Sequence, residues 1–180
     1  RINIPAEYQQ TFEFFNAQDK NTRVVTLPQP TFWSWRFHNN GYRGSGFIWY
    51  GIPQATLDRA FDPWSSTNEN YYWELSYALY SKNLALLENV IEKYQVNWIL
   101  IDENVINPTS PKSLYYDELK ELLSASGKVE LAQTFGKIRI YKVNLDTPVD
   151  KFVYVARDLP TVGPTYKWNS MDEAYMESGD

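Results

Sequence analysis

The sequence predicts a small three-layer α/β domain, in which helices cover both faces of a Rossmann-like sheet. A compact β-branched strand pattern, RVVTLP, occupies residues 23–28, and an aromatic-rich insertion follows it. The continuous apolar run VNWILID at 96–102 has the pattern of a strand covered on both faces, as in a parallel sheet. KVELAQTFGKIRIYKV at 128–143 reads as two strands around Phe135-Gly136, and therefore as a C-terminal β-hairpin.

The first helix is expected over residues 5–17, PAEYQQTFEFFNA. Pro5 suits the first position of a helix because its backbone nitrogen has no hydrogen to donate. Tyr8, Phe12 and Phe15 recur on one face, so this helix should pack against the sheet. The strand at 23–28 comes next in the chain.

The insertion contains several large rings and the only histidine, His38. Trp33, Trp35 and Phe37 alternate, as in a half-buried strand, and a turn-rich loop follows. FIWYG at 47–51 is a second short strand candidate. The residues after it, through Pro53 and Pro63, are expected to have no regular structure.

Two helices then precede the buried strand. Ser66 and Glu69 have capping-box spacing, and the helix they introduce continues through ENYYWELSYALYS, with Tyr72, Leu75 and Leu79 in register. Asn83 can cap the next helix. The apolar stripe of that helix consists of Leu84, Leu87, Ile91 and Tyr94.

A third helix is expected over 111–125, between the buried strand and the hairpin. Ser110 and Pro111 form its start signal, and Gly127 its stop signal. We expect one domain over residues 1–145 and a tail or linker over 146–180 that leads to a further module. In that tail FVYVA (152–156) can form a strand, but the rest lacks periodicity.

Composition excludes several classes of protein. The chain has 180 residues, with 17 basic and 22 acidic side chains, and no Lys/Arg cluster, so nothing predicts nucleic-acid binding. It has no cysteine, which excludes disulfides and thiolate chemistry. A single histidine leaves almost no material for a Ser-His-Asp triad or a multi-histidine metal site. We therefore expect no cofactor and no metal.

The chain starts at Arg1, without methionine or a signal segment, and contains no run of the ~18–20 apolar residues that cross a bilayer. It is expected to be a piece of a longer protein. GYRGSG at 41–46 is rich in glycine, but its spacing is neither that of a P-loop nor G-x-G-x-x-G. A tight turn between aromatic residues is the favoured interpretation.

Asp102 ends the predicted central strand, at the edge where α/β sheets usually place ligands. A carboxylate there could belong to a catalytic pair or hold a cation, but a strand-end acid is more often a helix cap or loop anchor. The rings also have two interpretations. They could stack on a sugar, or they could pack on the sheet as an accessory core, as most aromatic residues do.

The candidate ligand-binding residues are Tyr42, Arg43, Trp49, Tyr50, Asp62, Trp64, Asn68 and Asp102. The rings would supply stacking, Arg43 and Asn68 hydrogen bonds, and the acids orientation or loop anchoring. No catalytic residue is assigned.

The order of motifs is similar to that of a known family. RVVTLP, GYRGSGFIWYGIP, LDRAFDPWSSTNENYYWEL and KYQVNWILIDE follow one another, and FGKIRIYKVN closes the module. The region 20–145 thus resembles the extracytoplasmic soluble region of bacterial polytopic membrane proteins that are similar to GT-C type glycosyltransferases, which use lipid-linked sugar donors. The catalytic acids of that family lie in loops between transmembrane helices, which this chain does not contain. It also lacks the W-W-D-Y-G motif of oligosaccharyltransferases.

The resemblance implies a location on the extracytoplasmic face of the cell membrane and attachment to the protein's own transmembrane domain. The leading hypothesis is a non-catalytic domain of a membrane glycosyltransferase-like protein that helps to bind acceptor or sugar, as a glycan or a lipid-linked sugar. One alternative is a secreted glycan hydrolase with Asp62 and Asp102 as paired carboxylates, within about 5–10 Å of each other across a cleft. Another is a purely structural interaction module.

Overall fold

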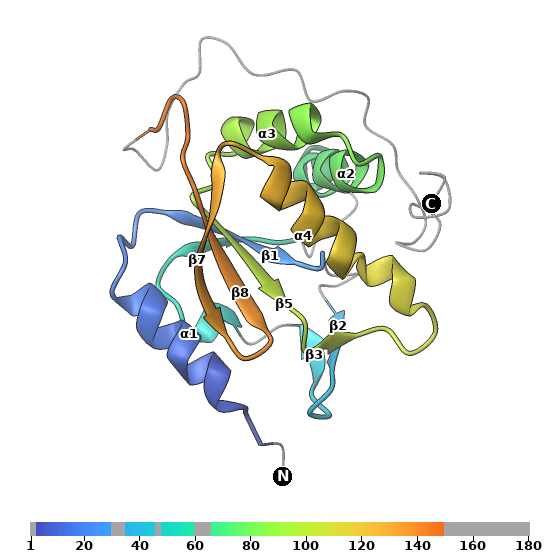
Figure 1. Cartoon of the computed structure of the whole chain (residues 1–180). Coiled ribbons are helices and arrows are strands. Elements are labelled where there is room, and N and C mark those ends of the chain that lie inside the picture. The colour runs from blue at the N-terminus through green and yellow to red at the C-terminus, as the bar shows by residue number, and fades with distance from the viewer. Residues whose placement is uncertain (1–2, 30–34, 46–47, 60–65, 150–180) are drawn as a thin grey trace.

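The helices and strands of this chain form two sheets and their helical cover (Figure 1). The structure is a computed structural model that describes residues 3–29, 35–45, 48–59 and 66–149. Within these residues the predicted α/β class is confirmed. The predicted tail strand at 152–156 lies outside them, and so does Trp33.

The larger sheet is mixed and has five strands in the order β4-β1-β5-β8-β7. Its strands are β1 (Arg23–Leu27), β4 (Ala55–Leu57), β5 (Trp98–Asp102), β7 (Val129–Phe135) and β8 (Ile138–Val143). β1 runs parallel to both β4 and β5, while β8 is antiparallel to β5 and β7. β5 is central and all five of its residues are buried, as its continuous apolar run predicts.

Three layers result, because helices cover both faces of this sheet (Figure 1). α1 (Ala6–Asn16) lies on one side, and α2 (Ser66–Tyr80), α3 (Leu84–Lys93) and α4 (Tyr116–Ala125) lie on the other. None of the helices in the described part of the chain has the length and apolar character to span a membrane.

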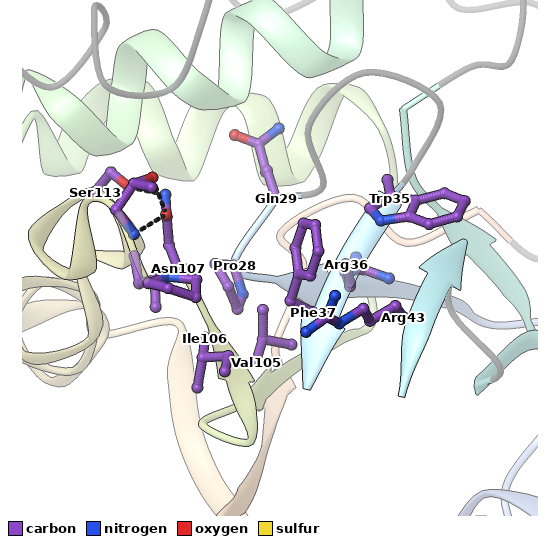
Figure 2. Close-up of a pocket in the computed structure, with 13 residues that line it drawn as sticks. Pro28, Gln29, Trp35, Arg36, Phe37, Arg43, Val105, Ile106, Asn107 and Ser113 are labelled. Atoms are coloured by element: carbon purple, nitrogen blue, oxygen red, sulfur yellow. Dashed lines mark hydrogen bonds between the residues drawn. The ribbon is translucent and has the colours of Figure 1, made fainter. Parts of the chain in front are cut away.

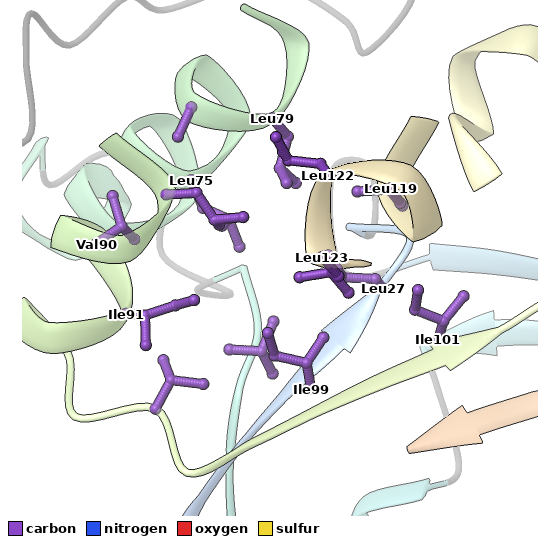
Figure 3. Packing of buried hydrophobic residues seen from close by; sticks show 14 of the residues in the cluster. Leu27, Leu75, Leu79, Val90, Ile91, Ile99, Ile101, Leu119, Leu122 and Leu123 are labelled. Carbon is purple, nitrogen blue, oxygen red and sulfur yellow. The ribbon is translucent and has the colours of Figure 1, made fainter. Parts of the chain in front are cut away.

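The larger core lies between the sheet and the three helices α2–α4. Figure 3 shows side chains of β1 and β5 facing leucines and isoleucines that point down from the helices. This packing follows the periodicity of the sequence, since Leu75, Leu79, Leu87, Ile91, Leu119 and Leu123 are all buried in it. The opposite face has a smaller core, in which Tyr8 and Phe15 of α1 pack against Val24, Leu100 and Ile140.

The smaller sheet has the order β3-β2-β6, and its strands are all antiparallel. β2 (Trp35–His38) and β3 (Arg43–Ser45) form a hairpin, and β6 (Val105–Ile106) pairs with the other edge of β2. Since β6 begins three residues after β5 ends, this sheet is attached at the carboxyl end of the central strand.

Two predictions for the insertion are wrong. The strand candidate at 47–51 is instead a single turn of 3₁₀-helix, η2 (Ile48–Tyr50). Residues 55–57, expected to be irregular, form β4, which pairs in parallel with β1. Three partly buried residues are too few to show a hydrophobic period, and their pairing depends on a strand thirty-two residues away.

The third helix is also shorter than the predicted span 111–125. Pro111–Leu114 form a 3₁₀-helix, η3, and Tyr115 then adopts a left-handed backbone conformation with φ of 58°. That conformation interrupts the helical path, so α4 begins only at Tyr116.

Other local predictions are confirmed. The side chain of Asn83 accepts a hydrogen bond from the backbone nitrogen of Leu86 at 3.1 Å, and so caps α3. The hairpin turns at Gly136, whose φ of 53° suits a residue without a side chain. α2 begins at Ser66, as predicted. The carboxylate of Glu69 accepts hydrogen bonds from Arg59 at 2.7 and 3.0 Å, and its capping-box bond to Ser66 stays a prediction.

Candidate functional site

A pocket with a volume of about 470 Å³ opens beside the smaller sheet (Figure 2). Its lining comes from the segment that follows β1, from β2, β3 and β6, and from residues 107–114, and we call it the β2–β6 pocket. It therefore lies beyond the carboxyl ends of β1 and β5, the edge at which α/β sheets usually bind ligands. Figure 2 shows Asn107 and Ser113 on the opposite side of the pocket from Phe37.

The alternation of β2 determines what the pocket wall presents. Successive residues of a strand point to opposite sides, and here Trp35 and Phe37 are 46% and 38% exposed while Arg36 and His38 are buried. The two rings line the pocket together with Val105 and Ile106 of β6. Phe37 and Ile106 are register partners, so they form one continuous apolar wall.

Most polar side chains in the lining are engaged by other protein groups. Gln29 is buried, and its amide nitrogen donates to the carbonyl of Tyr72 at 3.1 Å. Its amide oxygen accepts from the hydroxyl of Ser76 at 2.8 Å. These bonds fix the chain after β1 to α2.

Asn107 organises the opposite wall. Its amide nitrogen donates to the hydroxyl of Ser113 at 3.0 Å, as Figure 2 shows. Its amide oxygen accepts from the backbone nitrogens of Thr109 and Ser110, at 3.2 and 3.1 Å. The hydroxyl of Ser113 in turn donates to the carbonyl of Ser110 at 2.7 Å. The side chains of Asn107 and Ser113 therefore bond to groups within the same turn.

The pocket's buried arginine, Arg36, is paired with Asp58. Their side chains are 5% and 7% exposed, and Arg36 Nη2 lies 3.0 Å from Asp58 Oδ1. Arg36 also donates to the hydroxyl of Thr26 at 2.7 Å. The indole nitrogen of Trp49 donates to Asp58 at 3.2 Å. A buried carboxylate with this many donors is held by the scaffold.

Arg43 differs from Arg36 in being exposed, and it lies at the rim of the pocket. Its guanidinium carbon is 5.7 Å from the centroid of the Phe37 ring, within the range of a cation–π contact.

A second buried polar cluster lies on the other side of β2. The hydroxyl of Tyr8 donates to Asp102 Oδ2 at 2.7 Å and lies 3.1 Å from His38 Nδ1. Because the hydroxyl proton points to Asp102, the imidazole donates from Nδ1 to the hydroxyl oxygen. All three side chains are buried, so Tyr8 bridges the histidine and the acid.

Burial determines the protonation state of this cluster. Desolvation, with a contribution from the nearby Arg36 guanidinium, lowers the pKa of His38 to about 4. Although His38 Nδ1 lies 3.7 Å from Asp102 Oδ2, the imidazole is therefore neutral near pH 7 and the two do not form an ion pair. Burial raises the pKa of Asp102 above its ordinary value, while hydrogen bonds from Tyr8 and Asn104 act in the opposite direction.

Asn104 extends the cluster to the turn between β5 and β6. Its backbone nitrogen donates to Asp102 Oδ1 at 3.0 Å, and its side-chain nitrogen donates to Glu7 of α1 at 2.6 Å. Its carbonyl accepts from the backbone nitrogen of Asn39 at 2.8 Å. The cluster thus joins α1, the central strand and the β2–β3 hairpin.

The structure brings only some of the predicted site residues to the pocket. Arg43 lines it, whereas Trp49 lies behind it, bonded to the carboxylate that holds Arg36. Asp102 is 2% exposed and anchors the turn that follows β5. This is the role of a loop anchor, one of the interpretations considered for an acid at the end of a strand. The hydroxyl of Tyr42 donates to the carbonyl of Ser45 at 3.0 Å, inside the hairpin.

The remaining candidates lie elsewhere. Tyr50 is 89% exposed on η2 and does not line the pocket. Asn68 belongs to the first turn of α2, where its side chain is not described. Asp62 and Trp64 lie outside the described residues. The structure therefore gives no distance between Asp62 and Asp102 for the proposed carboxylate pair. Asp102 itself is hydrogen-bonded to Tyr8 and to the backbone of Asn104.

Sequence reasoning missed most of the pocket lining. Trp35 and Phe37 stood out as alternating rings but were not chosen as site residues. Arg36, between them, gave no signal, because its partner Asp58 lies twenty-two residues away. Gln29 and Asn107 follow β1 and β6, so their places at strand ends were the available signal.

The pocket has the size of a small-molecule site, but its described lining carries no acid–base group. It combines two half-exposed rings, aliphatic residues, engaged amides and one exposed guanidinium, with no His, Asp or Glu among the described residues that line it. Likewise, no group of three or more His, Cys, Asp or Glu in the described ranges is placed to hold a metal ion.

Comparison with known proteins gives likeness in structure only. No protein-family model matches the sequence, and no curated protein matches it either. The fold is similar to part of the arabinofuranosyltransferase AftD from mycobacteria, with a TM-score of 0.62 and 11% identity. That match covers 80% of this chain and 12% of AftD, so this chain spans about an eighth of that enzyme's length.

A mutant of the same enzyme matches with a TM-score of 0.60, again at 11% identity, over 80% of this chain and 13% of that one. The C-terminal globular domain of an oligosaccharyltransferase from Archaeoglobus fulgidus has a TM-score of 0.49 and 11% identity, over 79% of this chain and 99% of that domain. At this identity the likeness to AftD establishes a shared fold.

Proposed function

We propose that this chain is a non-catalytic domain of a membrane glycosyltransferase-like protein, and that its β2–β6 pocket helps to bind the acceptor or the sugar of the transfer reaction. The sequence resemblance to GT-C type proteins supports this proposal, and so does the fold shared with part of an arabinofuranosyltransferase. We place the domain on the extracytoplasmic side, attached to its own transmembrane region, on the basis of the same resemblance.

The observation that carries the proposal is the pair of half-exposed rings on β2. Large rings are usually buried, whereas Trp35 and Phe37 are both half-exposed and both line the pocket. Trp35, at 46% exposure, offers a flat face on which a saccharide can stack. The position beyond the ends of β1 and β5 is also where this class of fold binds ligands.

The engagement of two buried carboxylates, Asp58 and Asp102, supports the non-catalytic role. Transfer of a glycosyl group needs an acid or base that reaches the substrate. Asp58 is held by Arg36, Thr26 and Trp49, and Asp102 by Tyr8 and Asn104. Neither lines the pocket. Catalysis is therefore assigned to other parts of the parent protein.

Oligosaccharide binding by the isolated chain tests this proposal directly. A panel that includes arabinan fragments, measured by glycan array and then by titration, should yield a ligand that Trp35→Ala weakens about tenfold, as expected for loss of a stacked ring. Tyr50→Ala is the matched control, because it removes a more exposed ring that lies outside the pocket. Equal effects of the two variants, or no glycan binding, would instead favour the purely structural interaction module.

The location is tested with the full reading frame. Transmembrane helices upstream of Arg1, with an acidic residue in an intervening loop, are expected. In membranes containing the full-length protein, Trp35→Ala should lower sugar transfer mainly by raising KM, since the ring contributes binding alone. A signal peptide followed directly by this domain contradicts the proposal and favours a secreted enzyme.

A further inference from the structure

We infer that the interior of the β2–β6 pocket takes a hydrocarbon chain that ends in a single oxyanion, and not a saccharide ring. The ligand is thus an anionic amphiphile, whose chain lies along the apolar wall and whose head lies at Arg43. This inference rests on the proposed function in treating the pocket as a ligand site, and it specifies which part of a ligand enters.

The interior wall of the pocket is apolar. Val105 is a buried residue of the lining, Ile106 and Phe37 form the paired wall, and Pro28 and Leu114 also line the pocket. Such a surface gains free energy from each apolar group that it removes from water. With a volume of about 470 Å³, the pocket is of the size that holds small organic ligands.

The amide side chains of the lining already form hydrogen bonds to other protein groups. Gln29 is bonded to Tyr72 and Ser76 of α2. Asn107 is bonded to Ser113 and to its own turn. A saccharide carries a hydroxyl on most of its carbons, and each of these loses its bond to water on entering. The interior offers few replacements, so it discriminates against a sugar ring.

The charge of the described lining favours an anionic head group. The described lining includes two arginine residues, Arg36 and Arg43, and no carboxylate. Asp58 neutralises Arg36 from behind the wall, which leaves the positive charge of Arg43 at the rim. Arginine binds phosphate and carboxylate with two parallel hydrogen bonds, so one oxyanion at the mouth of the pocket is complementary to it.

The test uses twelve-carbon amphiphiles that differ only in their heads, titrated calorimetrically below their micelle concentrations. Dodecyl phosphate should bind one molecule per chain, more tightly than dodecyl maltoside and much more tightly than dodecyltrimethylammonium. Laurate, which has a carboxylate head, should bind like the phosphate if the oxyanion alone is recognised. Within an alkyl phosphate series, each methylene that enters should strengthen binding about fourfold.

Variants assign the two parts of the ligand. Arg43→Gln should weaken dodecyl phosphate about tenfold and leave dodecyl maltoside unchanged. Lys20→Gln is the matched control, because Lys20 is also an exposed cation but precedes β1 at the other end of the sheet. This variant should change the binding of neither dodecyl phosphate nor dodecyl maltoside. Ile106→Asn should weaken every dodecyl compound. Because Arg43 is exposed, its variant should fold, and circular dichroism checks this.

Three outcomes would overturn the inference: equal binding of anionic and cationic heads, no dependence on chain length, or no effect of Arg43→Gln on dodecyl phosphate. Failure of the proposed function looks different. If glycans bind through Trp35 but no amphiphile enters, the function stands and this inference falls. If dodecyl phosphate binds with the expected dependences while glycan binding and sugar transfer are absent, this inference stands and the function falls.

Discussion

Replacing His38 with glutamine should remove most of the acid sensitivity of this fold. The imidazole is buried against Tyr8 of α1, Asp102 of β5, Tyr42 and the neighbouring Arg36, and its pKa falls to about 4 from the ordinary 6.5. Between these two pH values the unfolded chain binds a proton that the folded chain does not. The free energy of unfolding therefore decreases as the pH falls, by about 1.4 kcal/mol per pH unit where only the unfolded state is protonated.

Integrated between pH 7 and pH 4.5, this difference in pKa amounts to a loss of about 2 kcal/mol of stability. The contribution of Asp102 to the pH dependence of stability has the opposite sign, because its raised pKa makes the folded state bind a proton more readily as the pH falls. Comparing the wild type with His38→Gln at each pH cancels that contribution to first order. Urea unfolding at pH 7, 6, 5 and 4.5 should therefore show the wild type losing about 2 kcal/mol more than the variant. A stability difference between the two proteins that stays constant from pH 7 to 4.5 would refute the reasoning.

Two further predictions concern packing and buried charge. A methyl group at Gly51 would lie 2.3 Å from the Phe12 ring, so Gly51→Ala should destabilise the fold by about 1–3 kcal/mol, whereas Gly127→Ala, which meets no atom within 4 Å, should change it by less than about 0.5 kcal/mol. Thermal unfolding of the pair checks this, and equal shifts in Tm would contradict the packing. Arg36→Met should cost about 3–5 kcal/mol, because it leaves Asp58 without its cation. Adding Asp58→Leu to Arg36→Met should recover much of that loss in urea unfolding, and no recovery would show that the pair is not coupled.

The parts of the fold that the sequence predicts well are those in which local chemistry decides. The four apolar residues of β5 have no alternative to burial on both faces, and they are buried. Asn83 caps α3 through its own side chain, and Gly136 turns the hairpin through its own backbone freedom. Each signal lies within a few residues of the structure it specifies.

The parts that the sequence does not predict depend on distant partners. β4 exists because Ala55–Leu57 pair with β1, and nothing within the three residues requires a strand. The break before α4 is a single left-handed residue, Tyr115, which the apolar period of the helix does not reveal. Propensity is a weak guide wherever tertiary contacts decide the conformation.

The candidate site shows the same division. The alternation of Trp35 and Phe37 predicted a half-buried strand, and β2 is one. Which face the rings occupy depends on Arg36 and His38, whose partners come from other elements. Asp102 was correctly placed at the end of the central strand, but its direction is decided by Tyr8 of α1, ninety-four residues away in the chain.

These buried partners explain how the rings are held toward the pocket. Arg36 and His38 alternate with Trp35 and Phe37 along β2, so each lies on the face opposite to the rings. Arg36 is fixed to Asp58 beyond β4, and His38 is fixed through Tyr8 to the end of β5. A register slip of one residue would place both rings inside and expose both polar groups, breaking two clusters at once. The buried polar partners of Arg36 and His38 therefore determine the orientation of the binding surface, so that replacing them should weaken ligand binding without removing a contact to the ligand.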